Sequence, residues 1–401
     1  MQSSLNNSTK TAIQSNFIKF KTQIYNLRRK IHQNPELGWH EIQTTDSLCE
    51  VLDEYNILYK RFHPTGLMVD IYGNSKDKKL IALRADLDAL AIKESKNMPY
   101  SSKVVGFMHA CGHDFHTAAL LGAVLITNSL KSKLNKNIRF IWQPSEEKEP
   151  SGALGVIKQG ALKNVEQLYA LHCDPSLEVG TLGIRSGAIT SAASGVDVTL
   201  FGKGGHTSRP HLTSDIVYAL SSLVVESAGY LSRRLDPRTV TSLIWGSLQA
   251  GEAPNSVASQ GQLAGSFRTM SLEIWQKAEV ILTKMISDIL QPYDFNLQIN
   301  VAKGIAPVVN SENATNIARF VAGRLFGENK IKSVARSLGA EDFAWLLLNN
   351  KSDGLKSDGA LIRLGVRGHN SSEFDLHTKS FQADEKCLDT ACPYLAALAL
   401  F

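Results

Sequence analysis

The sequence predicts an α/β protein with a smaller α+β domain inserted into it. At 401 residues the chain is too long for one ordinary hydrophobic core, so two domains are expected. Strand-like and helix-like segments alternate before and after the middle of the chain, which is typical of an α/β domain. The middle shows the order β-α-β-β-α-β, the ferredoxin-like pattern. We therefore expect residues 1–185 and 299–401 to form the larger domain and residues 186–298 to form the insert.

Apolar periodicity predicts the elements of the first part of the chain. Residues 17–33 carry apolar side chains at helical spacing, and Asn34 followed by Pro35 ends that helix. Short apolar runs predict strands that a covered sheet would bury. The other elements that we expect here are helices at residues 41–55, 118–130 and 152–162, and strands at residues 67–72, 79–84, 138–142 and 167–171.

The insert and the last part of the chain are predicted in the same way. The insert contains strands at residues 196–201, 239–250, 260–269 and 295–302, and helices at residues 213–233 and 272–290. Because the α/β pattern resumes afterwards, this segment is an insertion rather than a separate C-terminal domain. The last part contains a strand at residues 360–366 and helices at residues 311–327, 340–348 and 383–401.

Charge and composition argue against several classes of partner. The formal net charge is +5, and the basic residues are scattered without aromatic interleaving, so nucleic acid is not an expected partner. The five cysteines are odd in number and make no disulfide framework, which fits a reducing compartment. Residues 1–16 lack the apolar core of a secretory signal, and no apolar stretch reaches the length of a membrane span. We expect a soluble, cytoplasmic protein.

The run MHACGHDFHT at residues 108–117 has the strongest chemical character in the chain. It holds three histidines, a cysteine and an aspartate just before the apolar helix. Asp114 or Thr117 is expected to cap that helix, which would leave Cys111 and His113 on the preceding loop. Thiolate and imidazole are the ligands that zinc and similar transition metals prefer. The alternative is a buried free cysteine near hydrogen-bonded histidines.

Acidic residues follow two of the predicted strands. The run RADLD at residues 84–88 ends one strand, and Glu146 and Glu147 follow another. In an open α/β sheet, ligands bind beyond the carboxyl ends of the strands. Two adjacent carboxylates after a buried strand are costly unless a positive charge meets them, and a metal would serve. One could bind the metal while the other reaches a bound water; the alternative is a solvated turn.

Two further histidines complete a plausible ligand set. His172 is expected just past a strand, followed by Cys173 and Asp174, which we interpret as packing and loop residues. His377 follows a polar loop late in the chain. A lone histidine at a strand end is more often structural, so the argument depends on convergence of the whole set: Cys111, His113, Glu147, His172 and His377.

Within the insert, polar groups suited to a small ligand recur. Residues 202–210 form a glycine-rich turn that carries His206, but they lack the spacing of a dinucleotide or phosphate loop. The missing glycine fingerprint also argues against a nicotinamide oxidoreductase. Asn255 offers an amide and Arg268 a guanidinium, which fits a substrate carboxylate. Alone, each would more often be a turn residue or a surface charge.

In this order, the motifs resemble those of the dinuclear metal-dependent aminoacylase and carboxypeptidase family of metallopeptidases. The similarity is to its amidohydrolase branch, which includes hippurate hydrolase, N-acyl-L-amino acid amidohydrolase and indole-acetyl-amino-acid hydrolase. It extends from RRKIHQNPEL at residues 28–37 to His377, and the most specific motifs are HACGHD at 109–114 and QPSEE at 143–147. The resemblance implies a zinc-exopeptidase-like catalytic domain with an inserted ferredoxin-like lid.

The resemblance also implies a role for each candidate residue. Cys111 would be shared by two metal ions, one completed by His113 and His172 and the other by Glu147 and His377. Glu146 would be the general base, and Asp86 would lie behind the ligands rather than bind a metal. From the lid, His206 and Asn255 would face the substrate, with Arg268 a candidate for its carboxylate.

The implied reaction is hydrolysis of the amide bond of N-acyl-amino acids, hippurate-like or N-acetyl, by a metal-activated water. It would release a carboxylic acid and a free amino acid, acting on a carbon–nitrogen bond other than a peptide bond. The two divalent ions could be zinc, manganese, cobalt or nickel. The alternatives are a dipeptidase or carboxypeptidase acting on free peptides, and a non-catalytic metal-binding protein on the same scaffold. Both a monomer and a homodimer remain open.

Three positions depart from the pattern of the branch. Phe115 stands where a glycine is usual, Lys148-Glu149-Pro150 stands where a glycine commonly follows the paired glutamates, and His377-Thr378-Lys379 replaces a His-Asn-Pro form. None of these changes removes a ligand or the base. We expect Phe115 and the 148–150 segment to reshape the substrate pocket.

Overall fold

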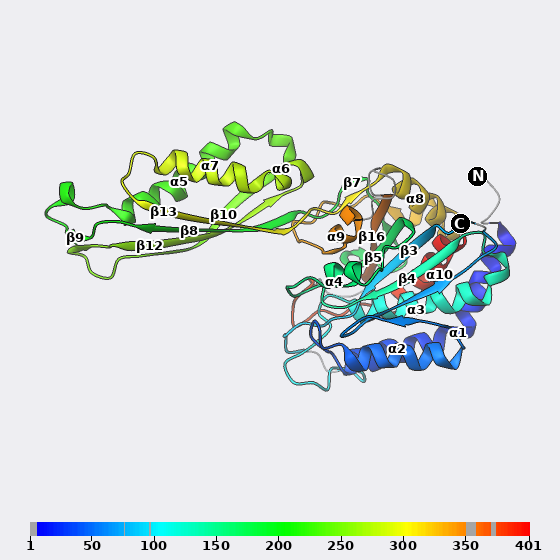
Figure 1. Ribbon diagram of the computed structural model, residues 1–401. Coiled ribbons are helices and arrows are strands. Elements are labelled where there is room, and N and C mark those ends of the chain that lie inside the picture. The colour runs from blue at the N-terminus through cyan, green and yellow to red at the C-terminus, as the bar shows by residue number, and fades with distance from the viewer. Residues whose placement is uncertain (1–5, 76, 96–97, 350–357, 370–373) are drawn as a thin grey trace. The chain divides into compact units, whose positions relative to one another are not determined.

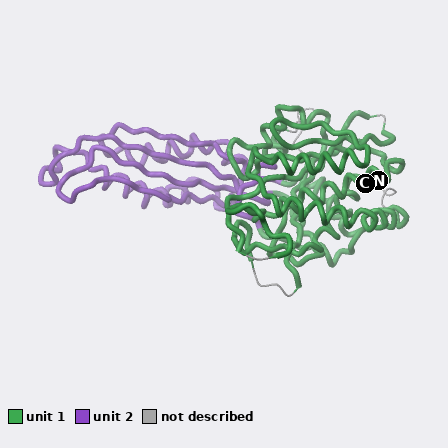
Figure 2. Tube along the Cα trace, turned by 90° about the horizontal axis from the view of Figure 1, so that it is seen from below, with its two compact units in different colours: residues 1–187, 310–335, 345–401 green, residues 188–309, 336–344 purple. Residues whose placement is uncertain are grey.

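The computed structural model describes residues 6–75, 77–95, 98–349, 358–369 and 374–401 (Figure 1). The chain divides into two compact units, each described below by itself (Figure 2). Unit 1 contains residues 1–187, 310–335 and 345–401, and unit 2 contains residues 188–309 and 336–344. The sequence analysis placed the insert at residues 186–298.

Unit 1 is built on a mixed eight-stranded sheet. Its central strands β4, β3, β5 and β16 are parallel neighbours, whereas β2 joins β4 in antiparallel direction. The carboxyl ends of β3, β4 and β5 therefore lie at one edge of the sheet, where parallel α/β sheets bind their ligands. The strand order is β1 (Lys60–Arg61), β2 (Leu67–Ile71), β4 (Asn137–Gln143), β3 (Leu80–Asp86), β5 (Val165–Glu178), β16 (Asp358–Arg367), β6 (Leu182–Gly183) and β15 (Ile331–Lys332).

The sheet is covered by helices whose apolar faces make one core. Helix α3 (His113–Ser129) is buried along nearly its whole length and packs against α1 (Asn7–Gln33) and α10 (Leu388–Leu400). This is the expected result for a helix that is apolar on all sides. Further α-helices of this unit are α2 (Ile42–Glu54), α4 (Gly152–Lys158) and α8 (Glu312–Phe326), and α9 (Phe343–Asn349) lies in it from Trp345 onward.

Helix α3 begins earlier than the sequence analysis expected. Gly112 occupies the N-cap position with φ 88°, and His113 is already the first helical residue. A side chain on Gly112 would place its Cβ 2.7 Å from the Cys173 sulfur, so this turn requires glycine. The prediction that Asp114 or Thr117 caps the helix is therefore wrong, since both lie within it. Apolar periodicity located the helix but could not reveal a polar first turn that is also buried.

A buried charge cluster joins α1 to the first turn of α3. The Asp114 carboxylate lies 2.8 Å from Arg28 Nε and 2.7 Å from His32 Nδ1, and all three side chains are buried. The Arg28 guanidinium also stacks over the Phe115 ring, 4.0 Å from its centroid. Phe115 has no exposed surface, so it belongs to the core and not, as expected, to a substrate pocket. The cluster thus fixes the helix that carries His113.

Unit 2 has the expected βαββαβ order and a core of its own. Its antiparallel sheet is covered by α5 (Ile216–Arg234), α6 (Leu272–Gln276) and α7 (Ala278–Leu290), so the single helix expected at residues 272–290 is divided at Lys277. Two short strands, β9 (Gly205–His206) and β11 (Ser256–Val257), form a separate pair. The main sheet has the order β10 (Thr241–Ala250), β12 (Gln260–Thr269), β8 (Ala192–Phe201) and β13 (Asn296–Ile305).

Two short strands mark the limits of the 188–309 segment: β7 (Gly187–Ala188) pairs with β14 (Val309–Asn310). Residues 188–309 therefore begin and end at adjacent points, and residues 336–344 belong to unit 2 as a second, shorter excursion of the chain. Within the described residues, no helix is both long and apolar enough to cross a membrane.

The Asp114→Asn substitution should destabilise the protein by about 3 kcal/mol, because it leaves the buried Arg28 guanidinium without its closest counter-charge. Denaturant unfolding measures the change. The control is Glu50→Gln, which removes the exposed partner of Lys30 and should change the unfolding free energy by less than about 0.5 kcal/mol. Equal effects of the two substitutions would contradict the structural role of the cluster.

The same cluster should make stability depend on pH. Although burial raises the pKa of Asp114, Arg28 and then His32 hold it well below its ordinary value. Its contribution is thus present above a pH of about 4 and is lost as the pH falls further. The wild-type protein should lose stability more steeply than Asp114→Asn below that pH.

Candidate metal centre

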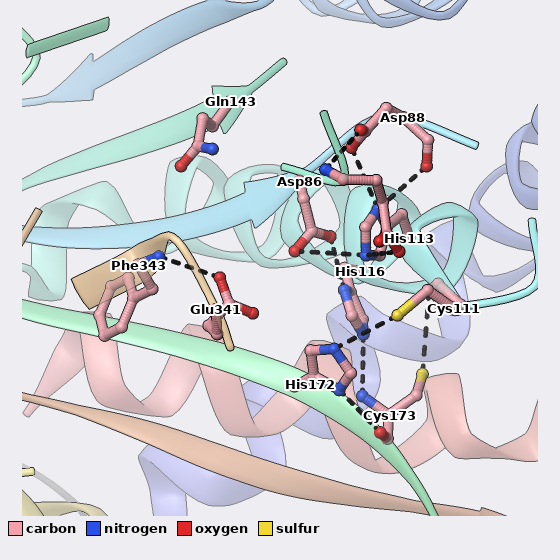
Figure 3. A network of polar contacts seen from close by, with 12 residues as sticks. Asp86, Asp88, Cys111, His113, His116, Gln143, His172, Cys173, Glu341 and Phe343 are labelled. Carbon is pink, nitrogen blue, oxygen red and sulfur yellow. Dashed lines mark hydrogen bonds and ion pairs between the residues drawn. The ribbon is translucent and has the colours of Figure 1, made fainter. Parts of the chain in front are cut away.

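The five residues expected to bind metal come together in two groups that share one cysteine. In the first group, one ligand atom from each of Cys111, His113 and His172 lies within 4.8 Å of the others. Cys111 Sγ is 3.5 Å from His172 Nε2 (Figure 3). In the second group, Cys111, Glu147 and His377 meet the same criterion, and His377 Nε2 lies 3.0 Å from a Glu147 oxygen. A thiolate common to both groups can bridge two ions.

Each ligand is positioned by a different part of unit 1. Cys111 lies on the turn before α3, His113 is the first residue of that helix, and Glu147 follows β4. His377 has a φ of 57°, and its backbone N–H donates to the Ala110 carbonyl at 2.9 Å. That bond ties the late loop directly to the cysteine turn.

His172 lies within β5 and not past its end. The strand continues to Glu178, pairs with β16 from Gln167 to Asp174, and directs the imidazole toward Cys111. The sequence analysis ended this strand before His172, because three polar residues there resemble a loop. Cys173 is fully buried, as its interpretation as a packing residue expected, whereas Asp174 belongs to the strand and not to a loop.

Asp88 contacts two of the candidate ligands, His113 and Glu147, and the sequence analysis did not assign it a role. His113 Nδ1 lies 2.9 Å from the Asp88 carbonyl oxygen and 3.2 Å from its carboxylate. The second carboxylate oxygen accepts the backbone N–H of Glu147 at 2.9 Å. A carboxylate behind a ligand histidine fixes the ring orientation and leaves Nε2 directed at the metal. The signal was present in the RADLD run, where both aspartates follow the strand.

Asp86 supports the site through a second histidine. Its carboxylate lies 2.6 Å from His116 Nδ1 and 2.7 Å from an Arg84 nitrogen, and His113 Nε2 is 3.8 Å away. His116 Nε2 in turn accepts the Cys173 backbone N–H at 2.9 Å, beside His172. Asp86 is thus fully buried, and His116, which the sequence analysis did not assign, connects it to β5. One atom from each of Asp86, His113 and His116 also lies within 4.8 Å of the others, so the place of Asp86 behind the ligands stays a prediction.

The electrostatics of the centre favour a bound cation. Although burial lowers it, the Asp86 and Asp88 carboxylates raise the pKa of His113 to about 10. Burial and then Glu147 raise the pKa of the Cys111 thiol well above its ordinary value. His113 Nε2 is buried and has no hydrogen-bond partner among the described residues. An orphaned imidazole nitrogen among carboxylates and a thiol fits transition-metal ions, which neutralise the carboxylates and displace the protons.

Glu146 stands next to the ligands. Its carboxylate, one of Glu147 and the His113 imidazole offer one atom each within 4.8 Å of one another. The carboxylate of Glu146 is therefore close enough to reach a group bound beside the ligands, which is the geometric requirement for a general base.

The three candidate residues of unit 2 fall into two places. His206 pairs with Ser256 across β9 and β11, and the Thr207 N–H donates to the Asn255 carbonyl at 3.3 Å, so His206 and Asn255 are neighbours. Arg268 lies toward the far end of β12, where its guanidinium donates to the Leu338 carbonyl. Along an extended strand, it is about 26 Å from the Gln260 end of β12.

Two groups of candidate metal ligands beside the carboxyl ends of parallel strands, with Glu146 next to them, are typical of a metal-dependent hydrolase. The chain belongs to the peptidase family M20/M25/M40, whose model matches residues 82–400. A solved structure of the YXEP protein of Bacillus subtilis, described as a dinuclear metal binding peptidase from the M20 family, is similar with a TM-score of 0.82 and 29% identity. The similarity covers 95% of this chain and 98% of that one.

Three curated relatives match nearly the whole length of this chain. An N-acetylcysteine deacetylase of Bacillus subtilis is 32% identical over 95% of this chain and 97% of that protein. An N-acetyldiaminopimelate deacetylase of Enterococcus faecalis is 33% identical over 90% of this chain and 93% of that protein. A Rhodococcus jostii protein with a glutamate–cysteine ligase name is 40% identical over 92% of this chain. The match covers 46% of that relative, so the chain spans less than half its length.

Asp88→Ala should weaken metal binding by about 10- to 100-fold, because it removes the carboxylate that contacts the His113 ring and accepts the Glu147 backbone N–H. The backbone carbonyl of residue 88 still contacts His113 Nδ1 in this variant. Competition with a chelator of known affinity measures the change. The control is Asp174→Ala, which removes a nearby carboxylate that accepts from Ser176 and should leave metal affinity unchanged. Wild-type affinity in Asp88→Ala would remove this residue from the centre.

Proposed function

We propose that this chain hydrolyses the amide bond of N-acyl-amino acids and releases a carboxylic acid and a free amino acid. The observation that carries the proposal is a pair of ligand groups sharing Cys111, with the further carboxylate of Glu146 beside them. The deacetylase names of two relatives that match nearly end to end support the same reaction class. Membership in a peptidase family supports hydrolysis over non-catalytic metal binding.

In this proposal Cys111, His113 and His172 would hold one divalent ion, and Glu147 and His377 would hold a second together with the same Cys111. Two divalent ions would polarise the scissile carbonyl and lower the pKa of water. Glu146 accepts the proton of the attacking water and returns it to the leaving nitrogen. Asp88 holds the His113 ring and the Glu147 backbone while this happens.

We assign the catalytic role to unit 1 and the role of a lid to unit 2. His206 is exposed at the β9–β11 pair beside Asn255, where both can reach a ligand. In this assignment His206 donates a hydrogen bond to the developing oxyanion, and Asn255 contacts the substrate. Arg268 is the weaker candidate for the substrate carboxylate, because its guanidinium is already bonded to the Leu338 carbonyl.

Hydrolysis of free peptides is the second candidate, since the family is a peptidase family. Initial rates on N-acetyl, N-benzoyl and dipeptide substrates, with zinc, manganese, cobalt or nickel added back, separate the two. Acetyl is the favoured acyl group, because both end-to-end deacetylase relatives are named for it. Higher kcat/KM on dipeptides than on any acyl-amino acid would overturn the proposal.

The state of the cysteines bears on the cellular compartment of the protein. All five cysteines are free and buried, and a thiolate that binds metal must stay reduced, which supports a cytoplasmic location.

For assembly, strand β10 favours a homodimer over a monomer, because it is an edge strand of its sheet in the described chain. Its Ile244 and Leu248 are 66% and 42% exposed, and a second copy could pair there. Light scattering should give twice the chain mass, and Ile244→Lys should restore the single mass.

Glu146→Gln should keep both metal ions and lower kcat by about 10³-fold, because the amide has the shape of the carboxylate but accepts no proton. Metal analysis and steady-state kinetics on an N-acetyl-amino acid check the two parts separately. The matched variant is Cys111→Ala, which should lose metal and turnover together. Full turnover in Glu146→Gln would exclude it as the base.

A further inference from the structure

The segment at residues 36–41 lies directly against the turn that carries the paired glutamates. Glu41 is fully buried, and one of its carboxylate oxygens accepts the Ser145 backbone N–H at 2.7 Å. The other oxygen accepts the Thr65 hydroxyl at 2.6 Å. Ser145 immediately precedes Glu146, so a side chain from the first part of the sequence holds the backbone next to the proposed base.

Ser145 has a backbone conformation that needs such support. Its φ is 47°, which is uncommon for a residue other than glycine, and its side chain is buried. The Ser145 carbonyl accepts the Gly152 N–H at 2.8 Å, and its hydroxyl donates to the Lys148 carbonyl at 3.0 Å. Ser145 therefore makes three hydrogen bonds, and of these only the bond to Glu41 involves a residue far away in the sequence.

The same segment makes two more close contacts with the glutamate turn. A Cβ on Gly38 would lie 2.6 Å from the Ser145 hydroxyl oxygen, so the two backbones approach closely. The Trp39 indole N–H donates to the Pro150 carbonyl at 2.8 Å. Residues 36–41 thus contact both ends of the 145–150 turn. This places the Lys148-Glu149-Pro150 departure within a supported turn.

We propose that Glu41 is a positioning residue, which orients Glu146 and Glu147 by fixing Ser145. Its carboxylate acts through Ser145 and Thr65, and the inference rests on the proposed function of those two glutamates. Burial raises the pKa of Glu41 to about 7 despite the hydrogen bond from Thr65, so this carboxyl is held in an unfavourable place. Two donors at 2.7 and 2.6 Å give it a geometric role there.

The test compares Glu41→Ala with Glu41→Gln and with Glu36→Ala in the full chain. An amide at position 41 can still accept from Ser145, whereas alanine cannot. Glu36 is the matched control, because its carboxylate accepts the backbone N–H groups of Gln43 and Thr44 at the start of α2. Its loss alters the same segment without touching Ser145.

Glu41→Ala should lower kcat by about 100-fold and change KM by less than about threefold, because a small displacement of the base affects the reaction more than binding. Glu41→Gln and Glu36→Ala should keep kcat within about fivefold of the wild type. If alanine at position 41 prevents folding, Glu41→Asp replaces it, with a shorter reach and an intermediate loss of kcat. A kcat for Glu41→Ala equal to that of Glu36→Ala would overturn the proposal.

Hydrogen exchange of the peptide containing Ser145 keeps this inference separate from the proposed function. Its backbone N–H should exchange at least about tenfold faster in Glu41→Ala than in the wild type, and at the wild-type rate in Glu36→Ala. Faster exchange in Glu41→Ala would support the role of Glu41 in fixing Ser145 even if the protein hydrolysed no acyl-amino acid. Absence of hydrolysis would overturn only the proposed function. Unchanged exchange in Glu41→Ala would show that Ser145 does not depend on Glu41.

Discussion

Parallel pairing of β3 with β4 and β5 is the constraint on which the rest of the centre depends. It brings the ends of two strands, and His172 within a third, to one edge of the sheet. Backbone hydrogen bonds fix the spacing of those strands, so ligands far apart in the sequence arrive at fixed distances. The three remaining candidate ligands are Cys111 and His113, at the turn that opens α3, and His377 on a late loop. The turn and the loop are bonded to each other through the His377 N–H and the Ala110 carbonyl.

Burial of charge is the second constraint, and it explains why the supporting residues are so many. Asp86, Asp88 and Asp114 have almost no exposed surface, and an unpaired buried carboxylate is strongly unfavourable. Asp114 is neutralised by Arg28 and His32 from α1. Asp86 is met by Arg84 and His116. Asp88 pairs with His113 through Nδ1 of the imidazole. The other ring nitrogen, Nε2, has no hydrogen-bond partner among the described residues and can face a cation.

The glutamate turn shows how a short motif depends on distant residues. The paired glutamates follow β4, but the conformation of Ser145 before them is not set by the strand. Glu41, Gly38 and Trp39 all contact the turn from the first part of the chain. The family model matches residues 82–400, so the segment that supports this turn lies before the matched region.

The sequence by itself determined the order of the elements and the choice of the five candidate ligands and the neighbouring Glu146, because strand and helix periods and metal-preferring side chains are local properties. The structure brings these six side chains together. It also indicated the βαββαβ character of unit 2. Only the tertiary structure decided which carboxylate supports which ligand, that Phe115 is a core residue, and that α3 begins at His113. The roles of Asp88 and Glu41 depend on contacts between segments far apart in the chain. Such contacts leave no periodic trace, because they follow from how the sheet and helices pack and not from the residues beside them.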